Sequence, residues 1–144
     1  MMHFLLYLSP EGIEIYNMIS RKVRVVENTP ICQKYDIFGW YQNTSKTMVF
    51  CTDKIVSKGN PKYYVNETLF HESTHVAQAC KQNMKEVKPL GISPSKMHLS
   101  DVRKNDLKVS AVINGSGIVP TEREAYWMED KPSQVKYVLQ KYCF

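Results

Sequence analysis

The segment His71-Glu72-Ser73-Thr74-His75 carries most of the chemical information in this chain. On an α-helix, residues four positions apart lie one turn apart on the same face, so both imidazoles can reach one metal ion. Zinc accepts imidazole nitrogens at about 2.0–2.1 Å, and neutral imidazole is a good ligand near pH 7. Glu72 stands beside the first histidine and can take a proton from a zinc-bound water without being a ligand itself. The motif therefore predicts a zinc site with His71 and His75 as metal ligands and Glu72 as the general base.

The sequence around the motif favours a helix. Apolar residues flank it on both sides, and we expect a helical segment from 65 to 83 with Asn66 as its N-cap. Two of the chain's four histidines fall on this single turn. Of the others, His3 lies in an apolar segment and is expected to be structural. His98 is expected to be an exposed loop residue, and it is also a weaker candidate for the third ligand.

A catalytic zinc site usually has three protein ligands and one open position. Lys81 occupies the position at which a metzincin-type motif would continue with a third histidine, which excludes that subclass. A glutamate from a later helix remains, and residues 121–126 offer both Glu122 and Glu124. Glu124 has another possible role: with Thr121 as N-cap, it would stand at the third helical position and complete a capping box.

An H-E-x-x-H motif followed by a helix with a glutamate three residues before an alanine resembles the gluzincins, and looks closest to small single-domain ImmA/IrrE-type peptidases. The resemblance covers only these two helices. It implies that Glu122 is the third ligand and Ala125 the small residue, with Glu124 as the alternative ligand. Tyr126 stands where the family usually has Asp or Asn, which orients a histidine ligand. The resemblance also implies a zincin-like fold, one catalytic Zn²⁺ ion and a peptide or protein substrate.

Other residues carry weaker predictions. Gln78 lies on the same helical face as the first histidine and could touch substrate or the groups around a metal ligand, with a plain buried polar side chain as the alternative. Tyr126 is a candidate for stabilising an oxyanion. Trp40 and Tyr41 are expected in the core. By analogy with zincins, the strand before the motif helix, residues 47–52, is expected to be the sheet edge along which an extended peptide pairs.

The remaining pattern predicts one α+β domain over residues 1–144, with a small twisted sheet, an active-site helix and a C-terminal helical part. There is no internal repeat. The expected elements are a helix over 10–21 capped by Ser9, a strand over 23–26, hairpin strands over 35–42 and 47–52, a loop over 57–61, and helices over 101–113 capped by Ser100, 122–130 and 132–142.

Composition excludes several classes of protein. Apolar residues make up 43% of the chain and aromatic residues 11%, which is typical of a folded domain and too rich for disorder. We expect no signal peptide and no membrane span, because no apolar run approaches the roughly 20 residues that a span requires. The net charge of +5 is spread among acidic and polar residues, so no specific nucleic-acid binding is expected. The sequence makes no prediction of oligomeric state.

The chain has four cysteines, Cys32, Cys51, Cys80 and Cys143, and no C-x-x-C motif. An even number allows two disulfides in three connectivities. At least one bridge is expected, with Cys80–Cys143 as first choice, because each of these cysteines ends a predicted helix. Free buried thiols are the alternative.

Two functions are compatible with these patterns. The first is zinc-dependent peptide-bond hydrolysis, with Glu72 activating the water. The alternative is a catalytically silent, zinc-stabilised binding or regulatory domain that keeps a zincin-like fold.

Overall fold

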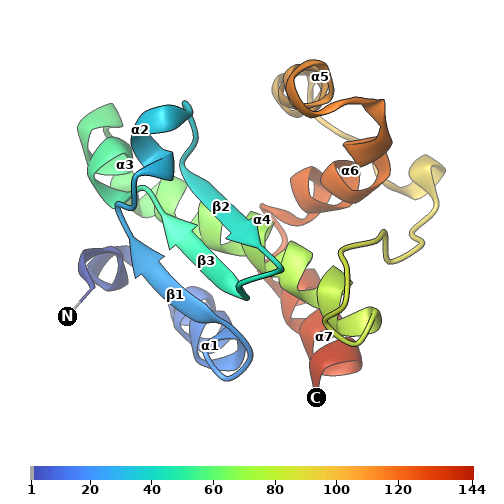
Figure 1. Cartoon of the computed structure of the whole chain (residues 1–144), viewed down its shortest axis with the longest axis horizontal. Coiled ribbons are helices and arrows are strands. Elements are labelled where there is room, and N and C mark those ends of the chain that lie inside the picture. The colour runs from blue at the N-terminus through green and yellow to red at the C-terminus, as the bar shows by residue number, and fades with distance from the viewer. Residues whose placement is uncertain (1) are drawn as a thin grey trace.

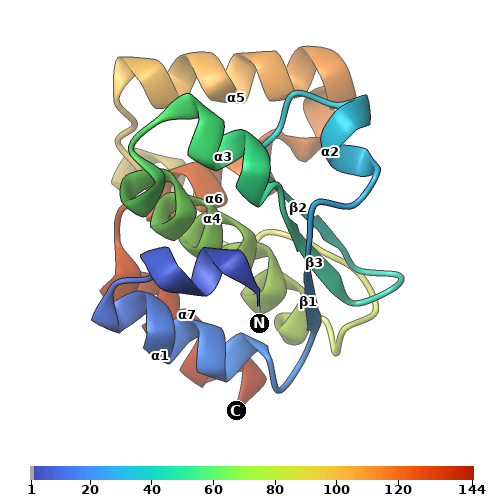
Figure 2. The same cartoon turned by 90° about the vertical axis from the view of Figure 1, so that its left-hand side faces the viewer.

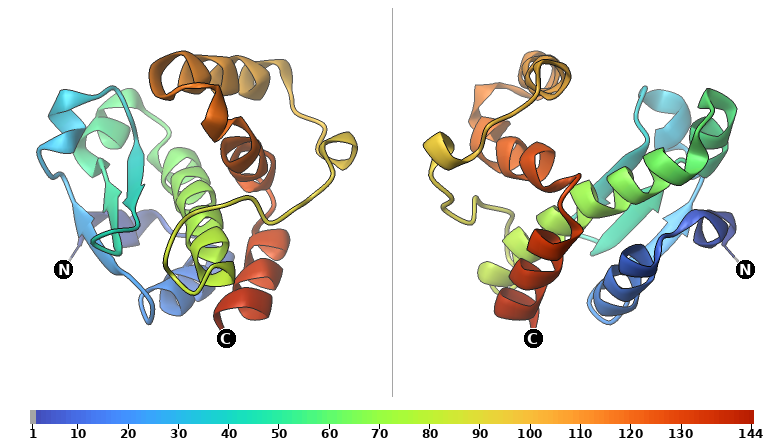
Figure 3. Two further views of the ribbon diagram at one scale, coloured as in Figure 1. Left: turned by 45° about the vertical axis from the view of Figure 1, so that its right-hand side comes forward. Right: turned by 180° about the vertical axis from the view of Figure 1, so that it is seen from behind.

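Helix α4, Pro61–Lys81, runs through the middle of the molecule and carries the H-E-x-x-H motif. It packs against the strands and α3 on one side and against α6 and α7 on the other (Figures 1 and 3). Because α4 has neighbours on several sides, almost every residue from Val65 to Cys80 is buried. Pro61 begins the helix at a position where its missing N–H group costs nothing.

The computed structural model describes residues 2–144, and the predicted α+β class is confirmed. A three-stranded sheet forms in the N-terminal half, and only helices follow it. In chain order the elements are η1 (His3–Tyr7), α1 (Pro10–Ile19), β1 (Arg24–Glu27), α2 (Ile31–Lys34), β2 (Gly39–Gln42), β3 (Thr47–Phe50), α3 (Thr52–Lys58), α4 (Pro61–Lys81), η2 (Pro94–Lys96), α5 (Asp101–Asn114), η3 (Ser116–Ile118), α6 (Val119–Met128) and α7 (Pro132–Cys143).

The sheet has the order β1-β3-β2. β2 and β3 form the predicted antiparallel hairpin, and β1 pairs with β3 in parallel. The prediction that residues 47–52 form the sheet edge is wrong, because β3 is paired on both sides and is the central strand. It is also shorter than predicted: the chain turns after Phe50 into α3, a helix that extends into the predicted 57–61 loop.

Alternate residues of β3 enter two different hydrophobic clusters, as the pleat of a strand requires. Met48 and Phe50 belong to the main core, which also contains the fully buried Phe4 of η1. Val49 points to the opposite face, into a smaller cluster with the cystine of α2. Figure 2 shows η1 and α1 on one side of the sheet and α5 across the top of the molecule.

The N-caps of two helices are confirmed, and that of α4 is wrong. The Ser9 hydroxyl accepts the Gly12 N–H at 3.0 Å, and the Ser100 hydroxyl accepts the Arg103 N–H at 3.2 Å. Asn66 does not cap α4, which begins more than one turn earlier. Instead its Nδ2 donates to the Tyr7 carbonyl, and its Oδ1 accepts from the Ser9 N–H, each at 3.0 Å. Asn66 therefore ties α4 to the start of α1.

Both pairs of cysteines form disulfides, which confirms Cys80–Cys143 and adds Cys32–Cys51. The first joins the C-terminal end of α4 to that of α7, and the second joins α2 to the residue after β3. Over residues 2–144, no helix has both the length and the apolar character needed to cross a membrane.

Removing the Cys80–Cys143 disulfide is expected to lower the free energy of unfolding more than removing Cys32–Cys51. The sequence separations are 63 and 19 residues, and a longer closed loop constrains the unfolded chain more strongly. The chain-entropy relation gives losses of about 4 kcal/mol for C80A/C143A and about 3 kcal/mol for C32A/C51A. Urea unfolding of both double variants measures this. A greater loss for C32A/C51A would contradict the prediction.

Candidate metal centre

Three side chains from two helices converge at the middle of α4. His71 and His75 lie one turn apart on α4, and Glu122 projects from the first turn of α6. The Nε2 atom of His71 lies 3.2 Å from Oε2 of Glu122, and Nε2 of His75 lies 2.6 Å from Oε1. One potential ligand atom from each of the three residues falls within 4.8 Å of the other two. Two imidazole nitrogens and a carboxylate oxygen are a typical donor set for zinc.

The far nitrogen of His71 already has an acceptor. Its Nδ1 lies 2.9 Å from Oε1 of Glu129, the residue that ends α6. An ionised carboxylate only accepts hydrogen bonds, so Nδ1 carries a proton, and once Nε2 gives up its own proton the Nε2 lone pair is left for a metal. Arg103 of α5 holds the other oxygen of Glu129 at 3.0 Å and also contacts Glu67 at 3.1 Å. The orientation of His71 therefore depends on residues from α4, α5 and the end of α6.

The far nitrogen of His75 has an acceptor too, but it is an amide. Nδ1 of His75 lies 2.7 Å from Oε1 of Gln78. The Gln78 Nε2 group donates to the Thr121 carbonyl at 3.0 Å and to Oε1 of Glu124 at 2.8 Å. Because its NH₂ end faces two acceptors, the carbonyl end must face the imidazole. His75 thus carries its proton on Nδ1 and presents Nε2 to the centre.

The pKa values reflect this concentration of opposite charges. Burial lowers the pKa of His71 and His75, but the nearby carboxylates, chiefly Glu122, together raise both by more, and the pKa of His71 ends well above its usual value. Burial raises the pKa of Glu122, yet the two imidazoles lower it by more, to well below its usual range. Without a metal, protons on the imidazoles therefore balance the carboxylate.

Glu72, the predicted general base, lies in the same turn of α4 and is 8% exposed. Burial is the main cause that raises its pKa. β2 passes directly over it: a Cβ atom added to Gly39 would lie 3.2 Å from the Glu72 Cγ and 2.4 Å from the Thr68 Cγ2. Only glycine fits this close approach, so Gly39 sets the distance between the edge strand and the motif helix.

Glu124, the alternative third ligand, lies outside the centre, and its predicted capping box is wrong. α6 begins at Val119, and the Thr121 hydroxyl donates to the Ile118 carbonyl at 2.8 Å instead of capping the helix. Glu124 is 1% exposed and bonds to Gln78 and to residues 90–92.

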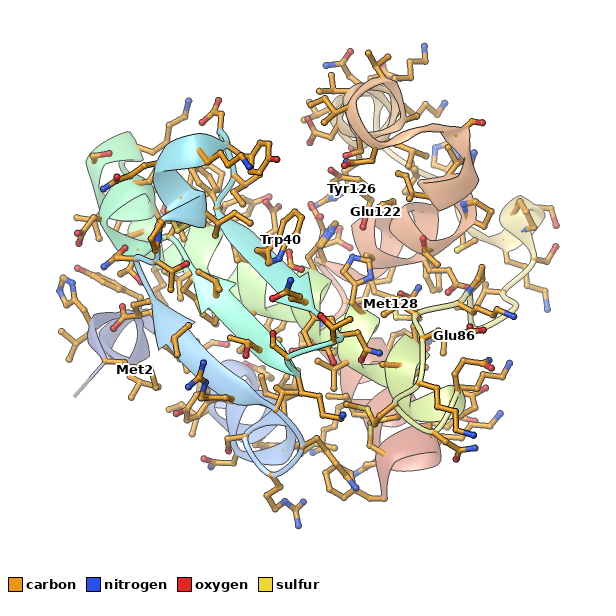
Figure 4. All side chains as sticks on the ribbon, viewed as in Figure 1. Met2, Trp40, Glu86, Glu122, Tyr126 and Met128 are labelled. Atoms are coloured by element: carbon orange, nitrogen blue, oxygen red, sulfur yellow. A yellow bond between two sulfur atoms is a disulfide. The ribbon has the colours of Figure 1, made fainter. Side chains whose placement is uncertain are left out.

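Tyr126 lies against His71 but does not hydrogen-bond to it. Their ring centroids are 4.6 Å apart, and the phenol oxygen lies 3.0 Å from the Ser110 hydroxyl of α5. Figure 4 labels Tyr126 and Glu122 where α6 approaches α5 and α4. In the gluzincin pattern, an Asp or Asn at the position of Tyr126 orients a histidine ligand. In this chain Glu129 makes the corresponding contact with His71. Its spacing of seven residues from Glu122, two turns along the same face, is a signal that the sequence contains.

The other predicted residues take no part in the centre. His3 and His98 are exposed, and neither belongs to the group that could hold a metal within the described residues. Tyr41 packs against the main core and Trp40 against the smaller cluster. Of the weaker predictions, Gln78 is the one whose side chain hydrogen-bonds to a candidate metal ligand.

The chain belongs to a family described as "Domain of unknown function (DUF8637)", whose family model matches residues 4–144. A search of curated proteins and a search of solved structures find no match. The family description names no chemistry, so the residues of the centre carry the functional interpretation.

Zinc binding near neutral pH is expected to release protons, and its affinity should rise with pH. Only neutral imidazole binds zinc, and the pKa values of His71 and His75 are raised in the metal-free protein, so protons compete with the metal. Isothermal titration calorimetry in two buffers of different ionisation enthalpy measures the protons released. Binding heats that do not depend on the buffer would contradict this account.

Proposed function

We propose that this member of the DUF8637 family is a zincin-like peptidase with one catalytic zinc ion, held by His71, His75 and Glu122, and with Glu72 as the general base. The observation that carries the proposal is the convergence of three ligand atoms within 4.8 Å of one another. The proposal also rests on the acceptor at each Nδ1 atom, since metal-binding histidines almost always donate their other N–H group.

The exposure of the ligands favours a catalytic site over a closed structural one. The side chains of His71, His75 and Glu122 are 12%, 10% and 21% exposed, respectively. A catalytic zinc site has three protein ligands and an open position for water and substrate, whereas a structural site is closed by a fourth ligand. Three ligands with partial exposure therefore support an enzyme over the catalytically silent alternative.

The surrounding residues suit the steps of peptide hydrolysis. Zinc, when bound, supplies a Lewis acid for the scissile carbonyl and makes water a stronger acid. Glu72 accepts the proton of the attacking water and passes it to the leaving amine. Burial raises its pKa above the usual carboxyl value, which makes Glu72 a stronger base for the first step. The acceptors Glu129 and Gln78 keep the imidazoles oriented throughout.

The substrate would be an extended peptide, and β2 is the strand best placed to bind it. β2 pairs with β3 alone among the described strands and lies against Glu72 through Gly39. A peptide added to the free edge of β2 would gain backbone hydrogen bonds beside the general base. A small sheet precedes the motif helix, and a helix that carries Glu122 follows it. This order of elements is the one expected from the resemblance to gluzincins.

Replacing Glu72 with Gln is expected to leave zinc bound and to lower peptide cleavage by at least about 100-fold, because the general base is removed while the ligands remain. The experiment incubates the zinc-loaded protein with a diverse peptide library, analyses the products by mass spectrometry and measures zinc content alongside. Glu86→Gln is the matched control, since Glu86 is an exposed glutamate that forms a surface ion pair with Lys88.

Equal cleavage by the wild type and Glu72→Gln would contradict the assigned base. If the zinc-loaded wild type cut no peptide while zinc raised its melting temperature sharply, the silent zinc-stabilised domain would replace the enzyme as the interpretation.

A further inference from the structure

Glu124 is a buried carboxylate next to the candidate metal centre that does not contribute a ligand. We infer that Glu124 is a positioning residue: it fixes the amide of Gln78, and through that amide the imidazole of His75, while anchoring the segment 90–92 to α6. This inference rests on the proposed metal site, which Glu124 would support through Gln78 and His75.

Four N–H groups converge on the two oxygens of Glu124. Oε1 accepts from the Leu90 N–H at 2.6 Å and from Nε2 of Gln78 at 2.8 Å. Oε2 accepts from the Gly91 and Ile92 N–H groups at 3.0 and 3.1 Å. A carboxylate offers about four lone-pair directions and only accepts, so four donors satisfy it completely. This pattern explains how a carboxylate that is 1% exposed is tolerated in the core.

The segment 90–92 is shaped to fit this carboxylate. Gly91 has a φ of +97°, a conformation that glycine adopts at little cost, and this turn directs three consecutive N–H groups toward one side. Nζ of Lys81, the last residue of α4, donates to the Leu90 carbonyl at 2.6 Å. The irregular chain between α4 and α5 is therefore fastened beside the centre at both the N–H and the carbonyl of Leu90.

Glu124 also decides which way the Gln78 amide faces. If the amide were flipped, its oxygen would face the Glu124 carboxylate and its NH₂ group would face the Nδ1–H of His75. Both contacts would be repulsive, and buried polar groups without partners are costly. Because Glu124 can only accept, the Gln78 carbonyl must point to His75, and Nε2 of His75 stays free for the metal. Gln78 bonds to both residues and so links Glu124 directly to the ligand His75.

The test compares zinc affinities of the wild type, Glu124→Gln and the double variant Gln78→Glu/Glu124→Gln by competition with a chromophoric chelator. Glu124→Gln should weaken zinc binding by about 10- to 100-fold, the usual effect of losing an outer partner of a metal ligand. The double variant should recover part of the loss, since the new carboxylate at 78 accepts from His75 and from the new amide at 124. A purely structural role for Glu124 would give no such recovery.

Gln78→Met keeps the result interpretable if Glu124→Gln does not fold. In that variant Glu124 retains its three backbone donors, so the fold and the exchange protection of the 90–92 amides should persist while zinc affinity falls by a similar factor. Wild-type zinc affinity in folded Gln78→Met or folded Glu124→Gln would overturn the inference alone. A wild-type protein that binds no zinc would overturn the proposed function, and this inference with it.

Discussion

The pairing of each motif imidazole with a fixed hydrogen-bond acceptor is the constraint on which the candidate centre depends. Glu129 accepts from His71 and Gln78 accepts from His75, so both rings present Nε2 to the same point. Two partly exposed imidazoles beside a carboxylate would otherwise be free to change tautomer and rotamer. The geometry at Glu122 is thus a consequence of contacts on the opposite side of each ring.

The helices after the motif are organised by this requirement. Three glutamates on α6 and its C-terminal end do three different things: Glu122 faces the centre, Glu124 anchors Gln78 and the preceding loop, and Glu129 orients His71. α5 contributes through polar side chains, because Arg103 holds Glu129 and Ser110 contacts Tyr126. These hydrogen bonds and ion pairs tie α5 to the site.

Much of the architecture could be predicted because its signals are local. The motif spacing, the caps at Ser9 and Ser100 and the hairpin depend on neighbours within a few residues. Glu122 and Glu124 could not be separated in this way. Residues two positions apart on a helix point in directions about 200° apart around its axis, and only the packing of α6 against α4 decides which of them faces the centre. The edge position of β2 and the Glu129 contact also depend on tertiary structure, as does the burial of Asn66.

The most direct measurement of the central claim is the anomalous diffraction of zinc in crystals of the protein with one equivalent of the metal. We expect a single strong peak about 2.0–2.2 Å from each of three atoms: Nε2 of His71, Nε2 of His75 and a carboxylate oxygen of Glu122. The absence of a peak at this point, or zinc bound by Glu124 in place of Glu122, would contradict it.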